Sequence, residues 1–257
     1  MSRIDMLPTY RAILFDLDNT LFDYDSSAQA ALIGALEEIG RVADGDDRSA
    51  LRADIYADYH HINAELWKQL ENGELDLNEL RIHRFQRLFD HRGWSDTDWE
   101  TFSRRYLDRL ASDVRMLPGA CRVLTALHHR YTLGVLTNGI AGVQRERIRL
   151  SGLAGCFTAV VISGEYGFAK PDPRIFSIAL DHLHSPRSQT LFVGDSVTSD
   201  MAGADRAGID FCWFNPENTP HPGMYTTRYC IRRLDDLLDI LAENQEIRDP
   251  QRITPPS

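Results

Sequence analysis

The chain has 257 residues and a formal net charge of −10, with 43% hydrophobic and 26% charged residues. This is the composition of a globular protein long enough to bury a core without disulfides, and no apolar run approaches the roughly 18 residues of a membrane span. A negative chain repels polyanions, and no basic run with interleaved aromatics occurs, so we expect neither membrane crossing nor polymeric nucleic acid as a partner.

The first predicted element is a short strand at residues 12–17, whose apolar residues indicate burial on both faces. No apolar segment of the secretory kind precedes it, and the four cysteines show no CxxC spacing, so we expect a cytoplasmic location. Asp16 and Asp18 stand at its end. An ionised carboxylate in such a place costs several kcal/mol unless it is paired or metal-bound. A functional role, such as metal binding or catalysis, would explain why two carboxylates stand at this position.

Helices are predicted next, because residues 26–112 contain no β-rich run. The first follows two serine cap candidates, Ser26 and Ser27, and has apolar residues at helical spacing. We expect further helices near 48–71, 76–91 and 96–112. The aromatic residues of this region are more typical of helix packing than of substrate contact; they are Tyr56, Tyr59, Trp67 and Phe85.

After Leu117-Pro118-Gly119 the pattern alternates between helices and short β-rich runs, which is typical of βαβ units on a parallel sheet. The runs are YTLGVLTNG, TAVVISG, TLFVGDS and DFCWFN. We predict an α/β fold with a Rossmann-like parallel-sheet core and an inserted all-helical cap. The expected boundaries are 1–21 and 113–247 for the core domain, 22–112 for the cap and 248–257 for a loose tail.

Polar side chains gather where the predicted strands end, and ligands of parallel sheets bind at the carboxyl ends of strands. Asp16 and Asp195 are candidate Mg²⁺ ligands, since Mg²⁺ prefers oxygen donors. An aspartate can also attack phosphorus, and Asp18 suits the acid and base role. Thr137 and Lys170 can neutralise phosphoryl oxygens. The residue types predict a magnesium-dependent phosphoryl-transfer site.

Each residue also has a structural interpretation. Asp18, Asn19 and Thr20 are compatible with a turn and helix cap, and residues 137–139 with a turn. Lys170 precedes a proline and is compatible with a solvated loop, and Asp200 with a helix cap. The site hypothesis is favoured because all of them follow successive strands in one order.

The motifs DLDNT, LTN, AKPDPRIF and GDSVTSD resemble the four-motif set of haloacid dehalogenase-like (HAD) phosphatases, from residue 12 to about 241. The resemblance implies Asp16 as nucleophile and Asp18 as acid and base, and it implies Mg²⁺ bound by Asp16, Asp195 and the Asp18 main-chain carbonyl. The remaining implied roles are phosphate binding by Thr137, Asn138 and Lys170, and support of the lysine and of the metal's water shell by Asp200. True dehalogenases lack the acid at the position of Asp18.

The substrate implied is a small-molecule phosphate monoester. The segments TNGIAGVQRERIRLSGL and GDSVTSDMAGADRAG are similar to the pyrimidine 5′-nucleotidase branch, which favours pyrimidine nucleoside 5′-monophosphates. An N-acylneuraminate 9-phosphatase is the alternative, with Arg81, Arg84 or Arg87 available for its carboxylate. A catalytically idle interaction protein and a phosphomutase are rivals of other classes. A monomer or homodimer is expected.

Overall fold

The computed structural model of the protein describes residues 9–42, 49–94 and 96–246, so the tail predicted at 248–257 lies outside the described residues. Its centre is a six-stranded sheet with the order β3-β2-β1-β4-β5-β6, in which every pairing is parallel. The strands are β1 (Ala12–Phe15), β2 (Thr132–Thr137), β3 (Ala159–Ile162), β4 (Thr190–Gly194), β5 (Asp210–Phe214) and β6 (Tyr229–Ile231). The predicted parallel sheet is confirmed. The edge strand β6 was not predicted, because three residues are too few to show a period.

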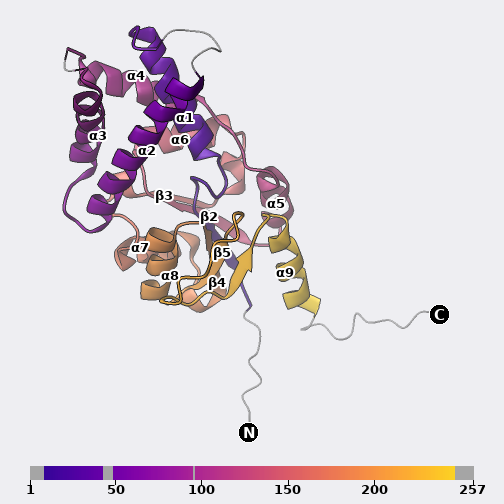
Figure 1. Cartoon of the computed structure of the whole chain (residues 1–257). Helices are drawn as coiled ribbons and strands as arrows, with labels where there is room; N and C mark the ends of the chain where they lie inside the picture. The colour runs from indigo at the N-terminus through magenta and orange to yellow at the C-terminus, as the bar shows by residue number, and fades with distance from the viewer. Residues whose placement is uncertain (1–8, 43–48, 95, 247–257) are drawn as a thin grey trace.

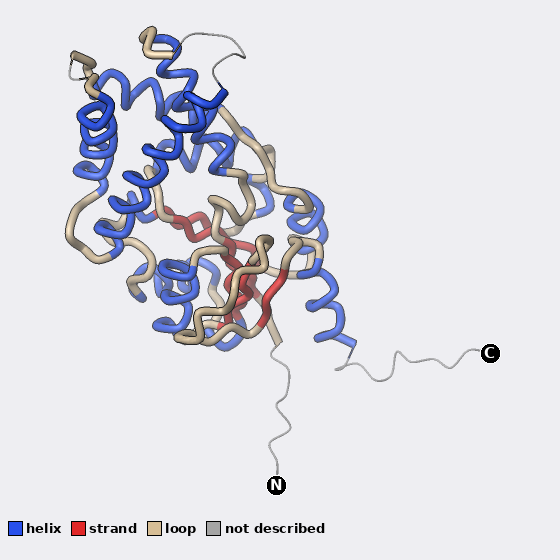
Figure 2. Tube along the Cα trace, in the orientation of Figure 1, coloured by secondary structure: helices blue, strands red, loops and turns tan. Residues whose placement is uncertain are grey.

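Helices cover both faces of the sheet (Figure 2). Ile13 and Phe15 of β1 pack in one apolar layer and Leu14 packs in the other, because successive side chains of a strand point to opposite faces. The first layer includes α5 (Ala120–Leu127) and α9 (Asp236–Glu246), and the second includes α7 (Pro173–Leu183) and α8 (Ala202–Ala207). Burial of β1 on both faces agrees with its unbroken apolar sequence.

Four helices are inserted between β1 and α5, and Figure 1 shows them grouped at one end of the sheet. They are α1 (Tyr24–Glu38), α2 (Ser49–Glu71), α3 (Leu77–Arg92) and α4 (Trp99–Ser112). The predicted helices are confirmed to within a few residues. The predicted serine cap is wrong, because Asp23 caps α1 by accepting a hydrogen bond from the backbone N–H of Ser26 at 3.0 Å.

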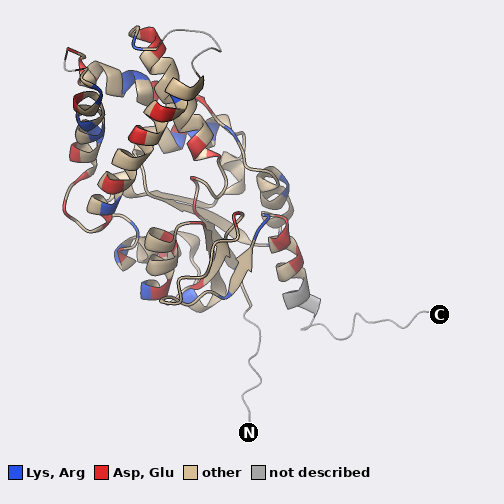
Figure 3. Cartoon of the chain, in the orientation of Figure 1, with Lys and Arg blue, Asp and Glu red and all other residues tan. Residues whose placement is uncertain are grey.

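The insert has an apolar core of its own, separate from the two layers on the sheet. Tyr59 and Phe85 are fully buried in it, and the Tyr59 hydroxyl donates to the Tyr106 hydroxyl at 2.7 Å. These two aromatics are packing residues, as predicted. Acidic and basic residues are interspersed along the insert helices (Figure 3). Ion pairs such as Arg52–Glu37 at 2.6 Å join neighbouring helices.

The core also contains a helix that contacts the insert and several short helical turns. Helix α6 (Ala141–Leu150) follows β2 and packs against α4 of the insert, so it joins the two parts. The remaining short helical turns are η2 (Ala154–Cys156), η3 (Ser163–Glu165), η4 (Arg187–Gln189) and the π-helical η5 (Val197–Met201). Within the described ranges, no helix combines the length and the apolar character that crossing a membrane requires.

Candidate active site

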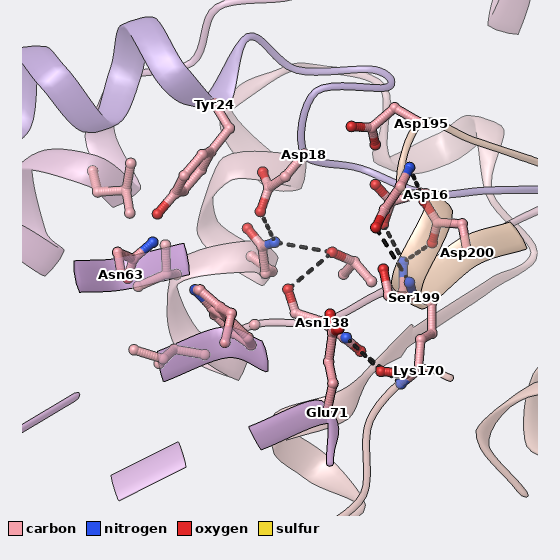
Figure 4. Close-up of a pocket in the computed structure, with 18 of the residues that line it drawn as sticks. Asp16, Asp18, Tyr24, Asn63, Glu71, Asn138, Lys170, Asp195, Ser199 and Asp200 are labelled. Carbon is pink, nitrogen blue, oxygen red and sulfur yellow. Dashed lines mark hydrogen bonds and ion pairs between the residues drawn. The ribbon is translucent and has the colours of Figure 1, made fainter. Parts of the chain in front are cut away.

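The predicted site residues meet at the carboxyl edge of the sheet, below the insert. Asp16 follows β1, Thr137 ends β2 and Asp195 follows β4, and these three strands are neighbours. A cavity of about 190 Å³ lies between this edge and the insert. All of the predicted site residues line it, as Figure 4 shows in part: Asp16, Asp18, Thr137, Asn138, Lys170, Asp195 and Asp200. The structure therefore brings together all seven of these predicted residues.

Lys170 is the cation at the centre of the site. It is 2% exposed, and its Nζ donates to Asp16 Oδ1 at 2.5 Å, to Asp200 Oδ1 at 2.7 Å and to the Leu136 carbonyl oxygen at 3.0 Å. Burial lowers the pKa of Lys170, but the adjacent Asp16 and Asp200 carboxylates more than offset this and raise it above its ordinary value. The side chain is thus an ammonium group fixed by three acceptors.

Asp200 approaches the end of β4 closely because residue 194 is glycine. A Cβ atom at Gly194 would lie 2.5 Å from Asp200 Oδ2. The same oxygen accepts a hydrogen bond from the Ser196 backbone N–H at 3.1 Å, and the side chain is fully buried. Glycine before the aspartate of the GDS motif is therefore required for the contact between Asp200 and Lys170.

Asp16, Asp195 and Asp200 form a group in which one carboxylate oxygen of each residue lies within 4.8 Å of the others. Burial raises the pKa of Asp16 well above its ordinary value, and burial together with the Asp200 charge raises that of Asp195 to about 7. Three carboxylates face one ammonium, so the group carries excess negative charge that a divalent cation would balance. Oxygen-only donors fit Mg²⁺. Asp16 and Asp195 would hold the ion beside Asp200.

Asp18 has partners different from those of Asp16. Its Oδ2 accepts a hydrogen bond from Gln144 Nε2 at 2.7 Å, and its Oδ1 accepts one from Arg147 Nη1. Arg147 is fully buried, with its guanidinium 4.9 Å from the centre of the Phe22 ring. Gln144 Nε2 also donates to Thr137 Oγ1 at 3.1 Å. Helix α6 therefore fixes the orientation of Asp18.

Asn138 uses its side chain to hold the loop that carries Lys170. Its Nδ2 donates to the Lys170 carbonyl oxygen at 3.0 Å, and its Oδ1 accepts from the Lys170 backbone N–H at 2.9 Å. Both ends of the amide are thus engaged by one residue of the neighbouring loop. The amide connects the end of β2 to the segment after β3.

The insert supplies the other wall of the cavity. Tyr24, Asn63 and Arg84 line it together with Trp67 and Glu71. In Figure 4, Tyr24 and Asn63 lie opposite Asp195 and Asp200, with Asp18 between the two sides. Burial raises the pKa of Glu71 to about 7. The cavity therefore has an acidic catalytic end and an end of mixed aromatic and polar character.

Comparison with known families shows to which family the chain belongs. The family model of haloacid dehalogenase-like hydrolases matches residues 10–208, which include every predicted site residue from Asp16 to Asp200. The chain belongs to the haloacid dehalogenase-like hydrolases. Its inserted helices α1–α4 correspond in position to the cap of this family.

Many proteins are similar to this HAD hydrolase, and three of them bear on its function. Pyrimidine 5′-nucleotidase PynA of Streptococcus pneumoniae is 37% identical over 238 residues, covering 91% of this chain and 96% of that protein. Pyrimidine 5′-nucleotidase YjjG of Escherichia coli is 30% identical over 236 residues, covering 90% and 98%. The crystal structure of the HAD-hydrolase YfnB of Bacillus subtilis bound to magnesium superimposes with a TM-score of 0.80 at 31% identity, covering 91% and 99%.

Some residues of this HAD hydrolase escaped the sequence reasoning. Gln144 and Arg147 occupy positions i and i+3 of α6 and face Asp18, but a polar pair at that spacing on a helix is typical of a solvent-exposed face. Asn63 was also missed, because it is one of many polar residues in the long helix α2 and nothing in its local sequence distinguishes it. Arg84 was one of three candidates, and it lines the cavity whereas Arg81 and Arg87 are exposed.

Proposed function

We propose that this protein is a Mg²⁺-dependent phosphatase that acts through an aspartyl-phosphate. The observation that carries the proposal is the meeting of Asp16, Lys170 and Asp195 at one end of the cavity, with Asp18 beside them. Lys170 engages Oδ1 of Asp16, which leaves the other carboxylate oxygen for attack. The cation, when bound, would neutralise charge on the phosphoryl oxygens.

The reaction has two steps. In the first, an Asp16 oxygen forms a bond to phosphorus while the bond to the leaving oxygen breaks, and Asp18 gives that oxygen a proton. In the second, a water oxygen bonds to phosphorus, Asp18 takes the water proton, and the Asp16 carboxylate is released with inorganic phosphate. We expect the Thr137 hydroxyl and the Asn138 main-chain N–H to donate to phosphoryl oxygens. The Asn138 side chain is already engaged by Lys170, and the Gly139 N–H donates to Ser163 Oγ at 3.0 Å.

For the substrate we propose pyrimidine nucleoside 5′-monophosphates, such as UMP, dUMP or dTMP, hydrolysed in the cytoplasm. Support comes from the two pyrimidine 5′-nucleotidases that match nearly the whole chain. Support also comes from Tyr24 and Trp67, aromatic residues that line the insert end of the cavity and offer faces for a flat base. N-acylneuraminate 9-phosphate remains the alternative, because the cation Arg84 lines the same end.

A substrate panel tests the proposal. Phosphate release is measured with Mg²⁺ for nucleoside monophosphates, sugar phosphates and N-acylneuraminate 9-phosphate under the same conditions. We expect the highest kcat/KM for a pyrimidine nucleotide. A sugar phosphate that exceeds every nucleotide by tenfold would refute the nucleotidase assignment, and isomerised sugar phosphate without released phosphate would indicate a mutase. Absence of turnover with every compound would favour the interaction protein.

A further inference from the structure

The insert end of the cavity contains a buried cation without an acidic partner. Arg84 is 2% exposed, and no ion pair to it occurs within residues 9–42, 49–94 and 96–246. None of the described residues accepts a hydrogen bond from its Nε or Nη2 atom. Arginine stays protonated in proteins and offers only donors. Two of the three guanidinium nitrogen atoms, Nε and Nη2, therefore lack acceptors.

The surroundings of Arg84 fix the plane of its guanidinium but leave the Nε and Nη2 donors unused. The guanidinium lies 4.9 Å from the ring centres of both Phe85 and Tyr106. Contact with aromatic faces stabilises the positive charge, yet the N–H groups point outward in the plane of the guanidinium. A ligand in the cavity that presents an acceptor oxygen to this edge would complete the site.

A second unpartnered group lines the same cavity. Asn63 is 7% exposed, and its Oδ1 atom accepts no hydrogen bond from the described residues. It comes from α2, whereas Arg84 comes from α3, so two separate helices direct incompletely bonded polar groups to one space. Buried polar groups are normally hydrogen-bonded, and exceptions that line a cavity point to a missing partner.

Building on the proposed function, we propose that Arg84 and Asn63 read the edge of the pyrimidine base. Arg84 donates to one ring carbonyl oxygen, while Asn63 accepts from the N3–H group and donates to the other carbonyl oxygen. Uracil and thymine present this acceptor, donor, acceptor sequence along one edge. Cytosine has an acceptor at N3 and requires the Asn63 amide to be reversed, so it binds less well.

The donor requirement of Asn63 separates a base from a simple acid. A carboxylate supplies acceptors to Arg84 but no donor to Asn63 Oδ1, which would then stay buried and unbonded. The imide edge of uracil satisfies both groups at once. Tyr24 and Trp67 line the same end of the cavity and complete a space suited to a flat ring.

The test compares dUMP with 2-deoxyribose 5-phosphate, which has the same reacting end without the base. We expect the wild-type protein to favour dUMP by about 100-fold in kcat/KM, and Arg84→Met and Asn63→Leu each to reduce that preference by about tenfold or more. Arg87→Met is the matched control, because Arg87 is exposed on the same helix. It should leave the preference unchanged.

The outcomes separate the inference from the function on which it rests. Melting temperatures are recorded first, and Asn63→Leu provides an independent reading if Arg84→Met does not fold. A wild-type protein that prefers dUMP, with variants that keep the whole preference, overturns the base-reading role alone. A wild-type protein that favours N-acylneuraminate 9-phosphate overturns the proposed function, and with it this role of Arg84 and Asn63.

Discussion

Replacing Asp195 by Asn should make the metal-free protein more stable, although it damages the site. Burial and the charge of Asp200 raise the pKa of Asp195 from its ordinary 3.8 to about 7. The ionised carboxylate is therefore unfavourable in the folded state. An asparagine keeps the oxygen that accepts from Thr20 Oγ1 at 3.1 Å but removes the repelled charge. The same substitution should remove most of the increase in melting temperature that Mg²⁺ causes, since a carboxylate ligand is lost.

The pKa shift sets the size and the pH range of the effect. A rise from 3.8 to about 7 corresponds to roughly 4 kcal/mol, since one pKa unit is worth ~1.4 kcal/mol. This is an upper bound, because the carboxyl group is crowded by protein atoms but part of the residue still reaches solvent, which screens the charge. Because the folded pKa is raised, the folded protein binds more protons, and its stability falls as pH rises from about 4 to about 7. Only about a third of the penalty acts at pH 5, and all of it acts at pH 8.

Thermal melts in EDTA at pH 5 and pH 8 measure the stability difference between Asp195→Asn and the wild type. We expect Asp195→Asn to exceed the wild type by several degrees at pH 8, at ~2 to 4 °C per kcal/mol, and by less than half as much at pH 5. Mg²⁺ at about 100 times its Kd should raise the wild-type melting temperature by an amount equivalent to about 2.7 kcal/mol. Asp181→Asn, at an exposed carboxylate of α7, is the control. A variant that melts below wild type at pH 8 without metal would refute the reasoning.

Three further predictions concern turnover. Asp16→Asn should abolish phosphate release, because an amide is a poor nucleophile; near-normal activity in the purified variant would disprove the mechanism. Asp18→Asn should lower kcat by roughly 10² to 10⁴ with alkyl phosphates and less with p-nitrophenyl phosphate, whose leaving oxygen needs no proton, so an equal loss on both would count against the acid role. Ca²⁺ should inhibit in competition with Mg²⁺, because it takes more ligands and would draw both oxygens of Asp16 to itself; full activity in Ca²⁺ would contradict this.

The site residues at strand ends could be predicted from the apolar sequence of each strand and from the rule that ligands bind at the carboxyl ends of parallel strands. The apolar runs before Asp16, Thr137 and Asp195 identify buried strands, and parallel strands place their carboxyl ends at one edge. Lys170 follows β3 by several residues, and its place at the same edge was predicted from the strand that precedes it. Its position against Asp16 depends on the loop held by Asn138, which only the structure reveals.

Residues on helices could not be assigned in the same way, since their roles depend on how each helix is turned and tilted against its neighbours. Arg81, Arg84 and Arg87 are equally spaced along α3, and nothing in their local sequence selects the one that is buried. Gln144 and Arg147 face the site because α6 packs between the sheet and α4. Tertiary packing thus decides which polar residue of a helix is functional.

The two aspartates that follow β1 are divided between two cations. Asp16 binds the ammonium of Lys170, from the loop after β3, and Asp18 binds the guanidinium of Arg147, from α6. Carboxylates two residues apart would otherwise repel each other and compete for one partner. Separate partners allow one to stay aimed at phosphorus while the other exchanges a proton. Since α6 also packs against α4 of the insert, the orientation of Asp18 depends on how the insert is seated over the cavity, whereas the contact of Asp16 with Lys170 is made within the core.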